Sequence, residues 1–313
     1  MQNFIWGIDL GGTKIEGIVL RSPKAEDVVA RLRIDTEAEK GYEHILQQIS
    51  RLCDQLAAVV GQRPTQIGIG TPGSISPATG LMRNSNTVCL NGKPLHKDLE
   101  TLLQIPVFIA NDANCFALAE AVLGAVPEHL SHFESVFGVI MGTGVGGGIV
   151  VGTPAGEAFL LNGKQGICGE WGHNFLDESG GKCYCGKIGC VETILSGTGL
   201  QHYYAQISGK QDKLKNIYKR YQQGADPHAK ATIERLIHFF GKAIANIVNI
   251  LDPDAIVLGG GVGNIQELYT LGLLEAKQYI FNPTPELLLL PPKLGDSAGV
   301  FGAAMLAYTN NKG

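Results

Sequence analysis

The residues best suited to chemistry lie in the middle of the chain, where one histidine and three cysteines occur close together. His173 is followed by Cys183, Cys185 and Cys190. Three thiolates and one imidazole complete the closed tetrahedral shell of a structural Zn²⁺, which leaves no open position for a catalytic water. Glycines at 181, 186 and 189 allow a short loop to wrap around one ion. The sequence therefore predicts a structural zinc site, with a chance cluster of reduced cysteines as the alternative, because C-x-C-x4-C is not a common finger spacing.

The composition is that of a globular protein. Of 313 residues, 17% are charged and 44% are hydrophobic, and the length favours two domains around a cleft. The net charge of −4 gives no electrostatic reason to expect a nucleic acid partner. Seven cysteines, an odd number, argue against a secreted disulfide framework, and no signal-peptide pattern opens the chain. We therefore expect a cytoplasmic protein.

One uncharged stretch, Ser135–Ala155, is long enough to cross a bilayer and contains small-xxx-small patterns. It is also rich in glycine, which makes a poor helix. A tight turn at Gly142–Gly148 between strands Val136–Met141 and Ile149–Val151 explains the pattern better. The sequence therefore predicts no membrane segment.

Each half of the chain opens with a strand, a glycine turn and a second strand. This repetition predicts an internally duplicated α/β architecture with the ligand cleft between the halves. The expected strands are Phe4–Leu10, Ile15–Leu20, Val28–Ile34, Gln66–Gly70, Val107–Ala110, Val136–Met141, Ile149–Val151 and Ala255–Leu258, and the expected helices are Tyr42–Val60, Ala113–Leu123, Ala229–Leu251 and Phe301–Tyr308.

Both glycine turns have the residues of a phosphate-binding loop. The first, from Asp9 to Lys14, combines an acid, Gly11, Gly12, Thr13 and a lysine. Glycine turns let backbone N–H groups approach a phosphate, and Asp9 is suited to hold Mg²⁺ through water. A plain hairpin turn is the alternative. The second turn carries Gly142, Thr143 and Gly144 in a G-x-G-x-x-G pattern, but a strand follows where a dinucleotide fingerprint requires a helix. We therefore expect a second phosphate loop.

Asp112 is the candidate general base. It follows a predicted strand and begins a predicted helix, where the helix dipole favours the ionised carboxylate. Such a carboxylate accepts a hydroxyl proton during phosphoryl transfer. The alternative is an ordinary helix N-cap, for which Asn111-Asp112 is well suited. Four further polar side chains on loops are suited to bind vicinal hydroxyls, although each alone would be taken for a surface residue: Asn86, Asn111, Glu170 and Glu192.

Taken together, these motifs resemble the ROK family of sugar kinases and repressors. The resemblance spans almost the whole chain, with the motifs in family order. They are Asp9-x-Gly-Gly-Thr13-Lys14, Asn111-Asp112-Ala-Asn114, Gly142-Thr-Gly144-x-Gly146-Gly147, Glu170-x-Gly-His173, Cys183-x-Cys185-Gly-x-x-Gly-Cys190-x-Glu192, Gly259-Gly260-Gly261 and Gly295-Asp296. Within the family, five segments look most like bacterial fructokinases of the manno(fructo)kinase type: Gly73–Pro77, Asn84-x-Asn86, Leu90–Pro94, Lys97–Leu99 and Glu170–Asn174.

The resemblance implies an actin-like, RNase H-like fold of two α/β domains. The small domain would span residues 1–112 plus a C-terminal helix at about 299–313, and the large domain, residues 113–298, would carry the zinc loop. The implied activity is ATP- and Mg²⁺-dependent phosphorylation of the 6-hydroxyl of fructose, with mannose or glucose as further substrates and Asp112 as general base. A homodimer is the family's habit.

The resemblance also implies roles for individual residues. Asn86, Asn111, Asp112, Glu170, His173 and Glu192 would hold the sugar. His173 would bind zinc through one ring nitrogen and donate to a sugar hydroxyl through the other. Asp9, Gly11, Gly12, Thr13, Lys14, Gly142, Thr143 and Gly144 would bind the phosphates, with Gly260 and Gly261 beside the nucleoside.

Three alternatives are weighed against fructokinase. The N-acetylglucosamine and other N-acetylhexosamine kinases of the family share Asn111–Asn114, Glu170, His173 and the cysteine loop. A catalytically silent sugar sensor would have no turnover. A repressor requires a helix-turn-helix before the kinase-like part, and we expect none because the first motif begins at Asp9.

Overall fold

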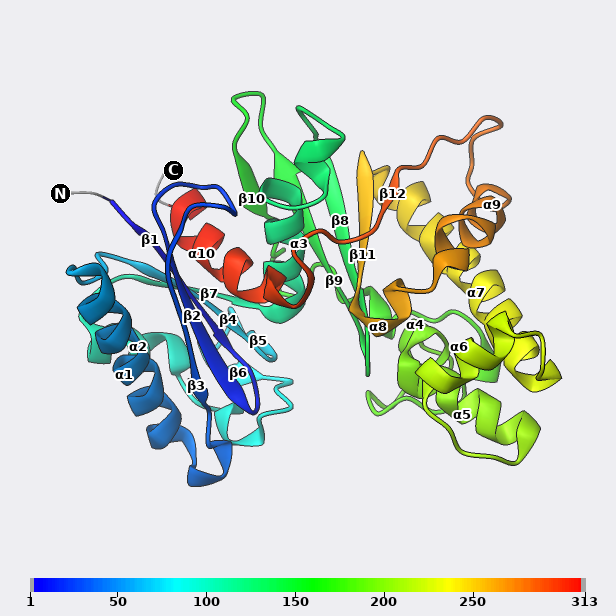
Figure 1. Cartoon of the computed structure of the whole chain (residues 1–313), viewed down its shortest axis with the longest axis horizontal. Coiled ribbons are helices and arrows are strands. Elements are labelled where there is room, and N and C mark those ends of the chain that lie inside the picture. The colour runs from blue at the N-terminus through cyan, green and yellow to red at the C-terminus, as the bar shows by residue number, and fades with distance from the viewer. Residues whose placement is uncertain (1–2, 311–313) are drawn as a thin grey trace. The chain divides into compact units, whose positions relative to one another are not determined.

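The computed structural model describes residues 3–310, which form two compact units (Figure 1). The first contains the residues up to Phe133, Gly148–Gly169 and the residues from Lys293 onward, and the second contains Glu134–Gly147 and Glu170–Pro292. The expected boundary at Asp112 thus differs from this division, because the helix that begins there packs within the first unit. Residues 311–313 of the expected C-terminal helix lie outside the described residues.

The first unit is built on a mixed five-stranded sheet of order β3-β2-β1-β4-β7. A two-glycine hairpin joins antiparallel β1 and β2, and β3 continues this antiparallel run. β4 and β7 lie parallel to β1, so longer crossovers precede them. The bounds are β1 (Ile5–Leu10), β2 (Lys14–Leu20), β3 (Val28–Asp35), β4 (Ile67–Thr71) and β7 (Val107–Asn111), with a small hairpin of β5 (Ser74–Ile75) and β6 (Met82–Arg83).

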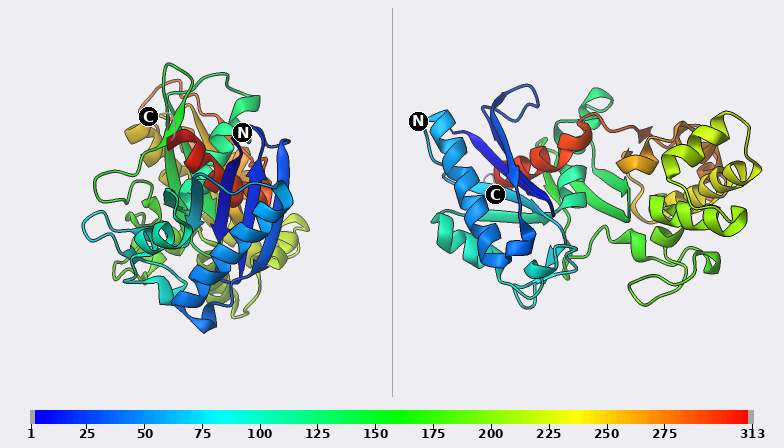
Figure 2. Two further views of the ribbon diagram at one scale, coloured as in Figure 1. Left: turned by 90° about the vertical axis from the view of Figure 1, so that its left-hand side faces the viewer. Right: turned by 60° about the horizontal axis from the view of Figure 1, so that its bottom comes forward.

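Helices cover both faces of this sheet (Figure 2). One face carries α1 (Tyr42–Val60), whose apolar stripe is buried, and α2 (Leu95–Leu103). The other carries α3 (Asp112–Val122) and α10 (Ala298–Asn310). On that face a side chain at Gly7 or Gly68 would collide with the α10 backbone, since a Cβ at Gly68 would lie 1.8 Å from Ala303 O. Glycine at these positions therefore brings α10 directly onto the sheet.

In the second unit, β8 (Ser135–Met141), β11 (Ala255–Gly259) and β12 (Leu289–Leu290) are parallel neighbours. β9 (Val145–Gly152) begins in this unit and ends in the first, where it pairs with β10 (Ala158–Leu160). The helices are α4 (Val191–Leu195), α5 (Gly197–Ser208), α6 (Leu214–Gln222), α7 (Pro227–Leu251), α8 (Gly260–Gly263) and α9 (Leu271–Lys277).

β9 begins earlier than expected, at Val145 instead of Ile149. The glycines after Val145 belong to the strand and not to the turn, and at least one is needed for packing: a Cβ at Gly148 would lie 2.7 Å from Asn114 Oδ1 on α3. The uncharged stretch thus forms two strands. Among the described residues no helix is both long and apolar enough to span a bilayer.

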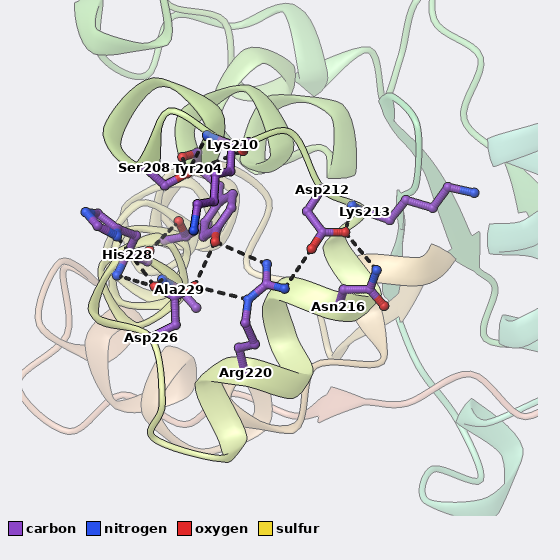
Figure 3. A network of polar contacts seen from close by, with 11 residues as sticks. Tyr204, Ser208, Lys210, Asp212, Lys213, Asn216, Arg220, Asp226, His228 and Ala229 are labelled. Carbon is purple, nitrogen blue, oxygen red and sulfur yellow. Dashed lines mark hydrogen bonds and ion pairs between the residues drawn. The ribbon is translucent and has the colours of Figure 1, made fainter.

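A polar network joins α5, α6 and the start of α7 (Figure 3). The Arg220 guanidinium contacts Asp212 at 2.7 Å and Asp226 at 3.1 Å, and it lies over the Tyr204 ring. Asp226 also caps α7 by accepting from the N–H groups of the first turn. This cap places the start of the helix at Pro227, two residues before the expected start. Arg220 is thus the link between three helices.

Candidate active site

Asp9 lies at the end of β1, where its side chain is closely surrounded by β4 and α10. It pairs across the sheet with Gly70 of β4, and its Oδ2 would lie only 2.7 Å from a Cβ at Gly299 in the first turn of α10. Burial raises the pKa of Asp9 to about 6, and the negative charges of Asp112 and Glu16 add to this effect. Asp112 therefore lies near enough for its charge to act on Asp9.

Asp112 is the first residue of α3, but it is not the cap of that helix. The cap is Asn111, whose Oδ1 accepts from the Asn114 N–H at 2.9 Å. The Asp112 carboxylate accepts from the Ala113 N–H at 2.8 Å and forms no ion pair in the part of the chain that the structure describes. Its side chain is accessible to solvent, yet enough protein surrounds it for lost hydration to raise its pKa, which the backbone bond from Ala113 partly offsets.

The first glycine turn projects from the sheet hairpin. The Gly11 N–H donates to Lys14 O at 2.9 Å, and the Thr36 hydroxyl donates to Gly11 O at 2.7 Å. Gly12, Thr13 and Lys14 are exposed at the tip. The turn is thus a closed hairpin with an accessible tip, a geometry consistent with both a phosphate loop and a plain turn.

Asn86 lies on an exposed loop that a second asparagine holds in place. The Asn91 side chain accepts from the Ser85 N–H and donates to Ser85 O, both at 2.9 Å. This pair of bonds fixes the backbone directly before Asn86, whose own side chain is exposed. Asn91 belongs to the Leu90–Pro94 segment, but its bonds to Ser85 could not be predicted from the sequence, because an asparagine before a glycine also suits an ordinary turn.

The second unit brings a second group of predicted residues together around the other glycine turn. The Gly142 N–H donates to Gly144 O at 2.9 Å, and Thr143 is exposed between them. Gly260, at φ +78°, lies against this turn, where a Cβ would meet Gly142 N at 3.0 Å. Gly261 follows it at the start of α8. A bound phosphate at this turn would therefore meet backbone from two segments.

Glu192 lies against the same turn. Its Oε2 accepts from the Val145 N–H at 2.9 Å, and a Cβ at Gly144 would lie 2.5 Å from that oxygen. A side chain at position 144 would therefore displace the Glu192 carboxylate from this place. One Glu192 oxygen is engaged in positioning the turn.

The predicted metal ligands lie together in the loop before α4. The ligand atoms of His173, Cys183, Cys185 and Cys190 all fall within 4.8 Å of one another. His173 Nδ1 is 3.6 Å from Cys183 Sγ, and the Sγ atoms of Cys185 and Cys190 are also 3.6 Å apart. A tetrahedron with Zn–S bonds of about 2.3 Å has edges of about 3.8 Å, so these separations suit one ion. They are far longer than a disulfide bond.

The loop backbone wraps around this cluster as the glycines predict. Gly181, Gly186 and Gly189 have φ values of +67°, +89° and +72°. At Gly189 a Cβ would in addition lie 2.4 Å from Asp177 O. Any side chain there would strain the loop, so the donor set and the backbone together fit a bound metal.

The Glu170–His173 segment is anchored on β9 by its tryptophan. The Trp171 indole N–H donates to Gly146 O at 3.0 Å, and a Cβ at Gly172 would lie 2.2 Å from Val145 O. Both contacts fix the short 3-10 turn Trp171–His173, which carries the imidazole to the cysteines. No role for Trp171 could be predicted from the sequence, since a buried tryptophan has no local signature.

Tyr184, between the first two cysteines, is a further residue that the sequence analysis missed. Its hydroxyl lies 3.0 Å from His173 Nε2, the nitrogen expected to face a sugar. Loss of hydration around that hydroxyl, followed by the negative charges of Glu192, Cys183 and Glu170, raises the pKa of Tyr184 to about 12.

The predicted residues thus form two groups, one in each unit. The first unit holds Asp9, Gly11, Gly12, Thr13, Lys14, Asn86, Asn111 and Asp112, and the second holds Gly142, Thr143, Gly144, Glu170, His173, Cys183, Cys185, Cys190, Glu192, Gly260 and Gly261. Their roles toward sugar and nucleotide remain predictions.

Comparisons with known proteins identify the family and the fold of the chain. The family profile described as the ROK family matches residues 5–310. An N-acetyl-D-glucosamine kinase of Pasteurella multocida is 35% identical over 312 residues, which cover 96% of this chain and 98% of the relative. The crystal structure of a ROK hexokinase from Thermus thermophilus matches with a TM-score of 0.87 at 31% identity, covering 99% of each chain.

A second solved structure was determined with ligands. A ROK family glucokinase from Streptomyces griseus, in complex with glucose and AMPPNP, matches with a TM-score of 0.74 at 26% identity, covering 97% of this chain and 99% of that one. None of these three relatives is named a fructokinase, so the expected preference for fructose finds no support here. The predicted actin-like two-domain fold is confirmed. The chain belongs to the ROK family and has the fold of its sugar kinases.

Proposed function

We propose that this chain is an ATP- and Mg²⁺-dependent sugar kinase that phosphorylates the 6-hydroxyl of an N-acetylhexosamine, with N-acetylglucosamine as the first candidate. The relative named N-acetyl-D-glucosamine kinase, which covers nearly the whole chain, supports the acetamido sugar. Fructose is retained as the second candidate because of the five segments that resemble fructokinases. A hydrophobic or hydrogen-bonding contact at one sugar position is worth only a few kcal/mol, so both sugars belong in the same assay.

The observation that carries the proposal is the environment of the Asp112 carboxylate. Asn111 caps α3, so the neighbouring aspartate is not needed for that purpose. Its carboxylate is accessible, is held by one backbone N–H and has a raised pKa. A carboxylate whose pKa is raised toward the working pH is a better general base than an ordinary surface aspartate. Asp112 would take the proton of the sugar hydroxyl as the phosphoryl group transfers.

The two glycine turns would bind the nucleotide phosphates through their backbone N–H groups. Asp9 would hold the Mg²⁺ that accompanies ATP through bound water, since Mg²⁺ takes few carboxylates and keeps several waters. A bound cation would also stabilise the ionised form of this carboxylate, which burial disfavours.

The cluster of His173 and three cysteines would hold a structural Zn²⁺. Its four protein ligands complete the tetrahedral shell, so the ion would shape the loop and take no part in the chemistry. The chain residues that depend on this loop are Glu170, Tyr184 and Glu192, each within or directly beside the ligand segment.

A coupled ADP-release assay with MgATP tests the proposal. N-acetylglucosamine, N-acetylmannosamine, fructose, mannose and glucose would be compared by kcat/KM. The highest value for an acetamido sugar is expected, and the highest value for fructose would overturn the substrate while keeping the reaction. Absence of turnover on all five, with sugar binding retained in calorimetry, would favour the silent sensor.

A further inference from the structure

Thr87 carries a buried hydroxyl that has no hydrogen-bond partner among the described residues. Its two sequence neighbours, Asn86 and Val88, are exposed, whereas Thr87 is only 6% exposed, so its side chain points inward. A buried hydroxyl without a partner costs free energy, because it has lost its bonds to water. Most buried polar groups in folded proteins are paired, so this one calls for an explanation.

The backbone around Thr87 does not use the hydroxyl. The Thr87 N–H donates to the Ser85 hydroxyl at 3.1 Å, and Thr87 O accepts from the Leu90 N–H at 3.0 Å. Thr87 directly precedes the 3-10 turn Val88–Leu90, where a threonine side chain commonly bonds the backbone, yet it forms no such cap. The hydroxyl therefore has to find its partner outside its own loop.

The Thr87 hydroxyl faces the first glycine turn at Gly12. A Cβ at Gly12 would lie 3.4 Å from Thr87 Oγ1 and, its two chain neighbours apart, would meet no other described atom within 4 Å. Both residues belong to the first unit. The loop that carries Asn86, a predicted sugar-binding residue, therefore lies directly against the turn proposed for the phosphates.

Between Gly11 and Lys14, the Gly12 carbonyl is the one acceptor without a donor. Gly11 O and Thr13 O accept from the hydroxyl and the N–H of Thr36, at 2.7 Å and 2.9 Å. Lys14 O accepts from the Gly11 N–H at 2.9 Å. No hydrogen bond from a described residue reaches Gly12 O. A donor without an acceptor and an acceptor without a donor thus lie on adjoining segments.

The Gly12–Thr13 peptide unit links this carbonyl to an N–H group suited to bind phosphate. The Thr13 N–H also has no partner in the described chain, and it lies at the exposed tip of the turn. A planar trans peptide directs its C=O and N–H to opposite sides. When the Gly12 carbonyl faces the Thr87 hydroxyl, the Thr13 N–H therefore faces away from it. Glycine at position 12 permits this rotation, and backbone N–H groups of such a turn bind phosphates.

We propose that Thr87 is a positioning residue for the nucleotide. When a phosphate of ATP binds at the tip of the turn, the Gly12–Thr13 peptide directs its N–H toward the phosphate, and Gly12 O accepts from the Thr87 hydroxyl. The hydroxyl gains its partner only in this bound state. The inference rests on the proposed function and adds to it a residue that acts through the turn and contacts neither substrate.

The test compares the wild type with Thr87→Val, which removes the hydroxyl at nearly constant volume. In urea unfolding without ligands, the midpoint of the variant should equal or exceed that of the wild type, because an unpaired buried hydroxyl is removed. Calorimetry with Mg²⁺ and AMPPNP should nevertheless give a Kd about 5- to 20-fold higher, because the bond forms only with nucleotide bound. The Kd for N-acetylglucosamine or fructose, measured without nucleotide, should stay unchanged.

Thr87→Ser and Thr232→Val are the matched controls. Thr87→Ser keeps the hydroxyl and should bind AMPPNP as the wild type does. Thr232 of α7 is also buried, but its hydroxyl has a partner, His228 O, at 2.8 Å. Thr232→Val should therefore lower the urea midpoint and leave the AMPPNP Kd unchanged.

The outcomes separate the inference from the proposed function. A lower urea midpoint in Thr87→Val would mean that the hydroxyl already has a partner in the free protein, and an unchanged AMPPNP Kd would mean that it gains none on binding. Either result overturns the inference alone. Equally weak binding by Thr87→Ser would assign the effect to packing and would also overturn it. A wild-type protein that binds no AMPPNP would overturn the proposed function and the inference with it.

Discussion

Replacing Asp9 with asparagine should make the protein more stable while it removes the proposed magnesium carboxylate. The carboxylate lies between Gly70 and Gly299, where a Cβ would approach its oxygens to 3.4 Å and 2.7 Å, so it has little room for water. Burial raises its pKa from the ordinary 3.8 to about 6, with Asp112 and Glu16 adding repulsion. At neutral pH the folded state therefore contains an ionised carboxylate whose charge destabilises it.

The magnitude follows from this shift. A pKa shift of about two units, at about 1.4 kcal/mol per unit, gives an upper limit of about 3 kcal/mol. The partial exposure of Asp9 reduces the expected gain in the free energy of unfolding to about 1–2 kcal/mol. Because the folded pKa lies above the unfolded one, the folded state binds more protons between these values. The stability of the wild type, relative to the variant, should therefore fall as the pH rises from about 4 to about 6 and stay constant above about 7.

Urea unfolding of the wild type and Asp9→Asn at about pH 5 and about pH 8 measures this effect, with an expected increase in the difference of about 0.5–1.5 kcal/mol between the two conditions. Asp27→Asn is a control, since Asp27 lies on the β2–β3 loop of the same unit. MgATP should stabilise the wild type but not the variant. A variant that is less stable at the higher pH, or a difference that does not change with pH, would refute the reasoning.

Three further predictions concern the base, the metal and the network of the second unit. Asp112→Asn keeps an Oδ1 acceptor for the Ala113 N–H, so the stability and the sugar Kd should stay unchanged. The kcat should fall about 10²- to 10⁴-fold, because the general base is lost. Unchanged turnover in the ADP-release assay would show that Asp112 is not the base. Cys185→Ser should lower the zinc content found by metal analysis and raise the sugar KM, and unchanged values of both would contradict the metal-loop argument. Asp226→Asn keeps the cap of α7 but removes the charge beside Arg220, which should cost about 0.5–1 kcal/mol in urea unfolding, whereas Asp226→Ala should cost about 1 kcal/mol more. The hydrogen bond from Tyr204 is the main cause that lowers the pKa of Asp226 to about 2. The stabilisation by this charge is therefore present above about pH 4 and is lost as the pH falls toward 2. Equal losses of stability in the two variants would contradict the separation of cap and charge.

The metal cluster was predictable from the sequence because all of its determinants are local. His173 and the cysteines lie in one loop, and positive φ at Gly181, Gly186 and Gly189 is what the glycines indicate. The hairpin at Gly11 and the helix Tyr42–Val60 were predictable for the same reason, since the turn chemistry and the apolar spacing are read within a few residues.

What the sequence did not predict depends on contacts between distant segments. Gly148 of β9 packs against α3, and the negative charge of Asp112, far away in the chain, adds to the effect of burial on the pKa of Asp9. Which of Asn111 and Asp112 caps α3 could be decided only once the Asn111 side chain was placed, because both residue types are good caps. Local spacing also could not show that Tyr184 would take the nitrogen assigned to a sugar.

Glu192 connects the metal loop to the second glycine turn through a hydrogen bond. The cluster ends at Cys190, and two residues later the Glu192 carboxylate accepts from the Val145 N–H and lies where a Cβ at Gly144 would approach it to 2.5 Å. At the other end of the same loop, Trp171 bonds Gly146 O. The metal loop thus contacts the start of β9 at both of its ends. The conformation of the loop and the conformation of the glycine turn therefore depend on each other. A metal that is remote from the phosphates in the sequence would therefore influence both the sugar residues and the backbone donors proposed for the nucleotide, without taking part in the transfer itself.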